Sequence, residues 1–313
     1  MKLFHSISDF KCKSKTIVTI GTFDGVHLGH QKILEKITSN ASLSNLESLV
    51  LTFFPHPRTV LQEGTEMKQL NTIEEKINLL DKIGIDNLVI HPFDKEFSRL
   101  TAEDFVKIVL VDKFHASKII IGFDHRFGRN RTADINDLID FGEKYQFDVE
   151  QISVEEINDV SVSSTKIRNA LNEGDVTLAN TFLDYRYSIK GLVIKGKQLG
   201  RTIGFPTANI QINEVYKLIP KEGVYIVCCD VESSTYYGMM NIGLNPTTDA
   251  NNQKQKIEVH LFDFNEDIYE KPITVSFLKR IRDEQKFESV AALKNQLSLD
   301  KLNAISYIEK TLS

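Results

Sequence analysis

Apolar positions in the first half of the chain follow two alternating patterns. Short runs rich in β-branched residues, typical of buried strands, lie at 15–20, 48–54, 87–90, 118–121 and 148–152. Segments with apolar residues at helical spacing fall between and after them, at 28–37, 72–83, 101–114, 134–145 and 163–172. This alternation predicts βαβ units around a mainly parallel sheet, which is an α/β, Rossmann-like fold.

The pattern changes near Asp184. Beyond it, short strand-like runs are separated by Gly, Pro, Asn and Asp, at 191–195, 223–231, 236–242, 256–264 and 272–277. Such runs are typical of a small antiparallel β-barrel. From residue 289 the apolar spacing is helical again. We therefore expect two domains, 1–184 and 185–313, the second ending in helical structure.

Composition narrows the class of protein. The 313 residues fit two domains, and 38 Lys and Arg against 43 Asp and Glu give a formal charge of −5. Without a basic excess we expect no nucleic-acid partner. Cys12, Cys228 and Cys229 have neither metal-ligand nor disulfide-framework spacing. No apolar run is long enough for a signal sequence or a membrane helix, so we expect a cytoplasmic monomer or weak homo-oligomer with no membrane partner.

The first candidate site is the segment GTFDGVHLGH, from Gly21 to His30, between a predicted strand and a predicted helix. Ligands of open α/β sheets bind at the carboxyl ends of strands, and a helix N-terminus there favours phosphate. Gly21 and Gly25 allow a tight turn. His27 and His30 are three residues apart, so they share a helix face and can stabilise growing phosphate charge. The alternative is a pair of surface or capping histidines.

The second candidate site combines GKQLGRTIGFPTAN, at 196–209, with IEVHLFDF, at 257–264. The glycine-rich part is not a Walker A loop, and an ordinary barrel loop would have a similar composition. Strand alternation places Glu258 and His260 on one face. We expect this carboxylate inside the barrel mouth, where it can accept a proton from an attacking alcohol. The alternatives are a solvated strand glutamate and a structural histidine.

Both segments resemble known motifs. GTFDGVHLGH resembles the HxGH signature of nucleotidyltransferases, and FDGVHLGHQ the form found in the bacterial bifunctional riboflavin kinase/FMN adenylyltransferase (FAD synthetase) family. GFPTAN resembles the PTAN motif of riboflavin kinases. Five further segments match that family in the same order, so the resemblance spans nearly the whole chain: 52–58, 121–131, 163–168, 241–248 and 282–287. It implies a nucleotidyltransferase-type domain followed by a riboflavin-kinase barrel with C-terminal helices.

The resemblance also implies roles for particular residues. The catalytic set comprises Glu258 as base of the kinase, with His27, His30 and Arg168 for adenylyl transfer. The implied ATP-binding residues, in addition to those two histidines and Arg168, are Gly21, Phe23, Asp24, Ser163, Ser164, Thr165, Gly196, Gly200, Gly204, Pro206 and Thr207. The implied flavin-binding residues are Phe54, His56, Asp124, Arg126, Asn241, Arg282 and Phe287. Thr207 and Asn209 would hold Mg²⁺, the implied cofactor, through oxygen atoms.

The implied activity is a two-step synthesis of FAD. ATP phosphorylates riboflavin to FMN, and a second ATP then transfers AMP to FMN, releasing pyrophosphate. The partners would be riboflavin, FMN, FAD and ATP. His125 and Ala133 depart from the family pattern in the loop near the flavin, which puts FMN affinity in doubt, and Asp184 departs from it between the domains.

Three other hypotheses stay open at this stage. The chain could be active in one half only, it could bind flavin without catalysis, or it could transfer a nucleotidyl group to another acceptor. The four catalytic positions are present, which argues against the second hypothesis. The PTAN half argues against the third.

Overall fold

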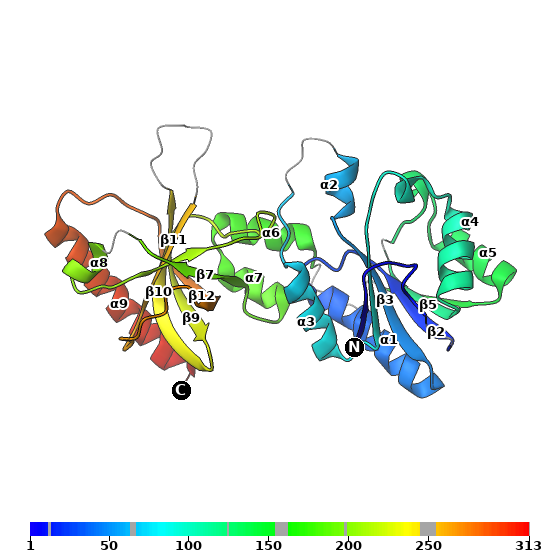
Figure 1. Cartoon of the computed structure of the whole chain (residues 1–313), viewed down its shortest axis with the longest axis horizontal. Helices are drawn as coiled ribbons and strands as arrows, with labels where there is room; N and C mark the ends of the chain where they lie inside the picture. Colours follow the sequence, from blue (N-terminus) through cyan, green and yellow to red (C-terminus); the bar gives the residue numbers. More distant parts are fainter. Residues whose placement is uncertain are drawn as a thin grey trace. The chain divides into compact units, whose positions relative to one another are not determined.

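The computed structural model describes residues 1–11, 14–62, 67–123, 125–153, 162–196, 199–244 and 255–312. These residues form two compact units, Met1–Ser164 and Thr165–Ser313. We name them the sheet unit and the barrel unit, and Figure 1 shows the elements of each. No helix among these residues is both long and apolar enough to cross a membrane.

The sheet unit is built on six parallel strands in the order β1-β4-β3-β2-β5-β6, which confirms the predicted parallel sheet. Only the three-residue β1, which has no apolar run of its own, was not expected. The strand bounds are β1 Lys2–Phe4, β2 Thr16–Ile20, β3 Glu47–Phe53, β4 Asn87–His91, β5 Ala116–Gly122 and β6 Asp148–Ile152. Every residue of β2 is buried, as a central parallel strand requires.

Helices cover both faces of this sheet. Ile33, Leu34 and Ile37 of one helix pack on one face with Leu80 of another, while Phe105 and Leu138 pack on the opposite face. The capping box of Thr72 and Glu75 is confirmed. The predicted helix at 101–114 starts with one α-helical turn and continues as a π-helix. The helix bounds are α1 Leu28–Ser44, α2 Pro57–Leu61, α3 Ile73–Ile83, η1 Phe97–Arg99, α4 Ala102–Asp104, η2 Phe105–Lys113, η3 Arg129–Arg131 and α5 Ile135–Tyr145.

The barrel unit contains a closed barrel of strand order β10-β11-β8-β7-β12-β9, as predicted. Five of its six strands were expected. The other strand, β8, has only four residues, and the first two belong to the PTAN motif, which was interpreted as part of a loop. The strand bounds are β7 Ser188–Ile194, β8 Ala208–Gln211, β9 Gly223–Val231, β10 Ser234–Leu244, β11 Gln255–Leu261 and β12 Pro272–Arg282. The helices are α6 Ser164–Glu173, α7 Val176–Leu183, α8 Leu199–Thr202 and α9 Val290–Leu312.

Burial separates the two faces of the barrel strands. Tyr225, Val227 and Cys229 of β9 fill the interior. Ile226 and Cys228 alternate with them and pack on the outside against Ala304 of α9. The C-terminal helix therefore covers part of the outer barrel surface, as Figure 1 shows.

The helices before the barrel belong to the barrel unit. Asn180 of α7 donates a hydrogen bond to the carbonyl of Phe277 at 2.9 Å, and Lys221 N donates to the carbonyl of Leu171 in α6 at 3.0 Å. In the sequence, the division between the two compact units consequently falls after Ser164, earlier than the boundary expected at 184. Residue 184 as the division between the two functions stays a prediction.

Candidate active sites

The segment GTFDGVHLGH forms a strained turn between β2 and α1. Phe23 and Val26 have φ values of 45° and 38°, and Gly25 has 89°. A β-branched residue at positive φ is unusual, and such backbone strain is concentrated at functional sites. Gly21 needs no positive φ; a Cβ there would crowd the ring of Phe23 at 3.0 Å.

The two predicted histidines are in contact. Their rings stack with centroids 3.7 Å apart and planes 17° apart. His27 is also the N-cap of α1, because its Nδ1 accepts a hydrogen bond from the backbone N–H of His30 at 3.4 Å. In the neutral tautomer, that bond leaves the ring proton of His27 on Nε2. A capping role and a catalytic role of His27 are therefore compatible.

Burial controls the charge of His30. The His30 ring also contacts Phe23 edge-on, with centroids 5.2 Å apart. Burial, and secondarily the neighbouring His27 and Lys76, hold the pKa of His30 well below its ordinary value. At neutral pH His30 is therefore uncharged, and it can donate only one ring N–H.

Lys76 is a member of this site that the sequence analysis missed. It is 1% exposed, and its Nζ donates to the carbonyl of Thr22, inside the turn, at 2.7 Å. Burial lowers the pKa of Lys76 to about 8, partly opposed by Asp24. One signal was present: Lys76 is three residues after Ile73 and four before Leu80, on the apolar side of α3.

Asp24, predicted to bind ATP, holds the turn from within. It is 1% exposed, and its Oδ1 accepts the backbone N–H groups of Leu70 at 2.9 Å and Asn71 at 3.3 Å. Its own carbonyl accepts a hydrogen bond from the Oγ of Ser164 at 2.9 Å. Asp24 therefore ties three distant segments together around the histidine turn.

The other predicted residues of the first site are more scattered. Ser163 and Ser164 belong to the sheet unit, whereas Thr165 and Arg168 belong to the barrel unit, although α6 starts at Ser164 and includes both of them. Arg126 is exposed, and Asp124 lies outside the described residues.

The aromatic pair after β3 has a structural position. Phe54 packs against the core cluster that contains Phe23 and Val26. His56 is buried, and its Nδ1 accepts a hydrogen bond from the backbone N–H of Arg58 at 3.1 Å, which caps α2.

The PTAN loop of the second site is shaped by its three glycines, each for a different reason. A Cβ on Gly196 would overlap the side-chain amide of Asn209, so Gly196 makes room for that residue. A Cβ on Gly200 would overlap the carbonyl of Phe205. Gly204 has φ 87°, which favours glycine. That these glycines open the backbone toward phosphate stays a prediction.

The strand register then places three predicted side chains side by side. Asn209 of β8 pairs with Glu258 of β11, and Glu258 pairs with Asn241 of β10. Directly paired residues share a face of the sheet. Ile257 and Val259 are buried in the interior, so we name Asn209, Glu258 and Asn241 the outer row. Glu258 thus lies on the outside of the barrel wall and not inside the barrel mouth as expected, because the apolar Ile257 and Val259 that alternate with it take the interior face.

Two neighbours complete this surface. Thr207 is two residues before Asn209, at the entry to β8, so extended chain geometry gives both the same face. Lys256 Nζ lies 2.7 Å from Glu258 Oε2. The hydroxyl, amide and carboxylate oxygens of Thr207, Asn209 and Glu258 are hard donors of the kind that Mg²⁺ prefers.

His260 is a structural residue of this site. It is buried between the rings of Phe205 and Phe262, with centroids 5.3 and 5.8 Å away. Its Nδ1 lies 2.7 Å from the carbonyl oxygen of Pro206, the first residue of the PTAN motif. This contact favours the structural alternative for His260.

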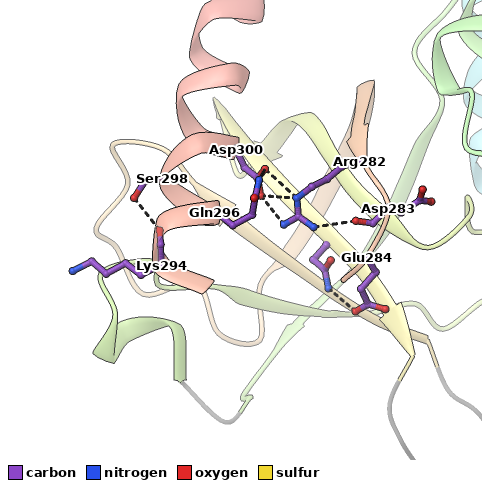
Figure 2. Close-up of polar contacts among 8 residues, drawn as sticks. Arg282, Asp283, Glu284, Lys294, Gln296, Ser298 and Asp300 are labelled. Atoms are coloured by element: carbon purple, nitrogen blue, oxygen red, sulfur yellow. Dashed lines mark hydrogen bonds and ion pairs between the residues drawn. The ribbon is translucent and has the colours of Figure 1, made fainter. Parts of the chain in front are cut away.

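Arg282, one of the residues expected to bind flavin, lies next to α9. Figure 2 shows that Arg282 is held by Asp300 of α9, a pairing the sequence analysis missed. The Arg282 guanidinium lies 5.8 Å from the centroid of the Phe287 ring. In the following segment, Glu284 Oε1 accepts a hydrogen bond from Asn241 at 3.4 Å, which joins this segment to the outer row.

Two classes of domain follow from this geometry. A parallel sheet with two stacked histidines at a helix N-terminus defines a nucleotidyltransferase-type domain, and the closed barrel with the PTAN loop defines a riboflavin-kinase-type domain. In agreement, the FAD synthetase family matches residues 9–166 and the riboflavin kinase family matches residues 183–308. The chain belongs to the bifunctional riboflavin kinase/FMN adenylyltransferase family.

Whole-chain relatives agree with this assignment. The chain is 40% identical to the bifunctional riboflavin kinase/FMN adenylyltransferase of Buchnera aphidicola subsp. Acyrthosiphon pisum, covering 98% of both chains. It is 38% identical to that of Bacillus subtilis, covering 94% of this chain and 93% of the relative. It also superposes on a crystal structure named for a macrolide-efflux protein from Streptococcus pneumoniae, with TM-score 0.88, 30% identity and 99% of each chain covered.

The two family matches confirm the predicted activity class. The chain is an ATP-using transferase of FAD biosynthesis, with a riboflavin kinase domain and an FMN adenylyltransferase domain. Its substrates are those of the two activities: riboflavin, FMN and ATP, with FAD as the final product.

Proposed function

We propose that the outer row carries the kinase reaction and that the stacked histidines carry adenylyl transfer. The observation that supports the kinase assignment best is the register that aligns Asn209, Glu258 and Asn241 beside the PTAN loop. The three residues come from three separate motifs, and composition alone does not explain why they are aligned across three paired strands.

In the kinase step, the 5′-hydroxyl of riboflavin attacks the γ-phosphorus of ATP. Glu258 accepts the hydroxyl proton as the new P–O bond forms and ADP leaves. Thr207 and Asn209 are the residues that would hold Mg²⁺, which supplies charge neutralisation to the phosphates when bound. Lys256, on the same face as Glu258, is placed to offset phosphate charge as well. The backbone around Gly196, Gly200, Gly204 and Pro206 forms the ATP side of this site.

In the second step, a phosphate oxygen of FMN attacks the α-phosphorus of the second ATP. The bond from the α-phosphorus to the β-phosphate oxygen breaks, and pyrophosphate leaves. The nucleophile is already an anion, so the protein has to supply alignment and charge stabilisation rather than a base. His27 and His30 donate hydrogen bonds to the phosphates, and Lys76 keeps the turn in place.

The other expected residues bind the triphosphate and the flavin. Arg168 binds the triphosphate as a planar clamp together with Ser163, Ser164 and Thr165. The flavin is held by Phe54, His56, Asp124 and Arg126 at the adenylyl-transfer site, and by Asn241, Arg282 and Phe287 at the kinase site. A cytoplasmic location, a monomeric or weakly oligomeric state and the absence of nucleic-acid partners stay predictions.

Two substitutions, assayed separately for the two products, test this division. Glu258→Ala is expected to abolish FMN formation from riboflavin while FAD formation from added FMN persists. His30→Ala is expected to do the reverse. Glu266→Ala, at an exposed position outside both sites, is the control and is expected to leave both activities intact. Near-normal rates of both steps in both variants would refute the site assignments.

A further inference from the structure

Asp300 is a charged side chain with no role in the two reactions described above. It lies in the middle of α9 and is completely buried. Its carboxylate accepts three contacts from Arg282: Nε at 3.1 Å from each oxygen and Nη2 at 2.7 Å from Oδ2. Gln296, one helical turn earlier, donates to Oδ1 at 2.9 Å. Figure 2 shows the three side chains together, and Arg282 is the last residue of β12.

Fold stability alone is a weak explanation for this arrangement. Taking a carboxylate and a guanidinium out of water costs free energy that their attraction only partly returns, and apolar replacements of buried ion pairs are often neutral or stabilising. The surroundings of Asp300 are apolar enough for such a replacement, since Ala304 and Leu297 on the same helix pack in the cluster between α9 and the barrel. A buried ion pair at this position therefore points to a need for defined geometry.

The Arg282–Asp300 pair holds the segment 282–287 in place. Arg282 Nη1 donates to the carbonyl of Asp283 at 3.0 Å, and its guanidinium lies against the Phe287 ring. Glu284, in the same segment, accepts the hydrogen bond from Asn241 of the outer row. A Cβ on Gly243 would overlap the Glu284 carboxylate, so the segment lies close against β10. Asp300 thus fixes, through Arg282, the segment that borders the outer row.

We propose that Asp300 is a positioning residue for riboflavin in the kinase reaction. From α9 it sets the orientation of the Arg282 guanidinium and of the 282–287 segment against which the flavin ring binds. The inference rests on the proposed flavin role of Arg282 and Phe287. It adds that the C-terminal helix determines flavin affinity without touching the reacting atoms.

Asp300→Asn tests this directly, because it keeps the shape of the side chain and removes the charge that orients Arg282. The KM for riboflavin is expected to rise about 10-fold or more, the effect of losing hydrogen bonds to a charged group. The KM for ATP in the same assay is expected to stay within about 2-fold of wild type. FAD formation from added FMN, which is assigned to the sheet unit, is an internal measure of the amount of active enzyme. Ser298→Ala is the matched control, because Ser298 is exposed on the same helix and its Oγ donates to the Lys294 carbonyl at 3.0 Å.

A double variant separates positioning from mere support of the fold. In Arg282→Met/Asp300→Leu both charges are replaced by apolar side chains, which keeps α9 packed even if Asp300→Asn unfolds locally. If Asp300 acts through Arg282, the double variant has the same riboflavin KM as Arg282→Met alone. A double variant that regains the wild-type KM would show that the pair only supports packing.

Two further outcomes overturn the proposal. One is a wild-type riboflavin KM in Asp300→Asn, and the other is an equal rise in the KM values for riboflavin and ATP. These results are distinguishable from failure of the proposed function. If Glu258→Ala abolishes FMN formation and Asp300→Asn leaves the riboflavin KM unchanged, only the positioning role is lost.

Discussion

The two sites of the chain organise their charged groups in opposite ways. In the sheet unit, the ionisable groups around the histidine turn are buried: Asp24 and Lys76 are 1% exposed and His27 is 6% exposed. In the barrel unit, the Glu258 side chain is 22% exposed on the outer surface and is paired with Lys256. The first site is fixed by a strained turn and buried charges, the second by strand register and by a helix outside the barrel.

This difference determines what each site is sensitive to. Buried groups interact in a medium of low dielectric constant, so one charge alters the protonation of its neighbours, as Lys76 does for His30. In the outer row, by contrast, the orientation of each side chain depends on the space around it and on its hydrogen-bond and ion-pair partners. We therefore expect the sheet unit to respond most to charge and pH, and the barrel unit to steric changes.

The largest effect is expected from Gly196→Ala. The new methyl group would occupy the space of the Asn209 amide and push it out of the outer row. Displacement of a positioning group by about 1 Å can cost on the order of 100-fold in rate. FMN formation is expected to fall by about that factor. FAD formation from added FMN is expected to stay unchanged, and chromatographic separation of the flavins measures both.

Gly84→Ala is the matched control for Gly196→Ala. Gly84 has a φ of 88°, so alanine is strained there, but a Cβ at this position meets no atom within 4 Å. It should therefore destabilise the sheet unit slightly and keep both activities. Wild-type FMN formation in Gly196→Ala would mean that the position of Asn209 does not limit the kinase.

A smaller effect, on the other site, is expected from Lys76→Met. The variant loses the bond to the Thr22 carbonyl and one of the causes that lower the pKa of His30. FAD formation at pH 7 is expected to fall about 10-fold, as for loss of a charged hydrogen bond. In the variant the pKa of His30 rises, so His30 becomes protonated at a higher pH. The acidic limb of the pH–rate profile for FAD formation therefore moves to higher pH. FMN formation should keep its wild-type profile.

Lys76 also has a predictable signature in stability. Its folded pKa of about 8 is below the ordinary 10.5, so between these values the unfolded state binds more protons. The free energy of unfolding of the wild type should therefore rise from pH 8 to pH 10.5, and Lys76→Met should lack this rise. Urea unfolding followed by circular dichroism measures it, since the chain has no tryptophan. Lys82→Met, exposed on the same helix, is the control, and identical curves for the two variants would contradict the assignment.

How much of each site could be predicted from sequence follows the same division. The histidine turn is contiguous, so the apolar runs before and after it predicted its strand and helix, and the three-residue spacing of the histidines predicted a shared face. Lys76 was missed because it lies 46 residues after His30 and was interpreted only as part of an amphipathic helix. A lysine on the apolar side of a helix was the available signal, and it has meaning only once the helix is packed.

In the barrel unit the motifs were found but their arrangement was not. Asn209, Glu258 and Asn241 come from three segments, and only the pairing of β8, β11 and β10 shows that they form one row. β8 itself was missed because it has four residues. Asp300 occupies a position three after Leu297 and four before Ala304, on the side of α9 that packs on the barrel, but its partner Arg282 is 18 residues away. Register and long-range pairing are properties of the closed barrel, and local periodicity does not encode them.

The smallest predicted effect separates a steric from an electrostatic role in the barrel unit. His260→Phe keeps an aromatic ring between Phe205 and Phe262 but loses the contact with the Pro206 carbonyl. One neutral hydrogen bond is worth about 0.5–1.5 kcal/mol, so the KM for ATP in FMN formation should rise about 2- to 10-fold with little change in kcat. His5→Phe, at an exposed position, is the control. Burial lowers the pKa of His260 in the folded state, so below pH 6.5 the unfolded state binds more protons than the folded state does. The free energy of unfolding of the wild type should therefore decrease as the pH falls below 6.5, and that of His260→Phe should decrease less. A large fall in kcat would instead give His260 a direct part in the chemistry, and the barrel site would then resemble the sheet site in depending on a buried titratable group.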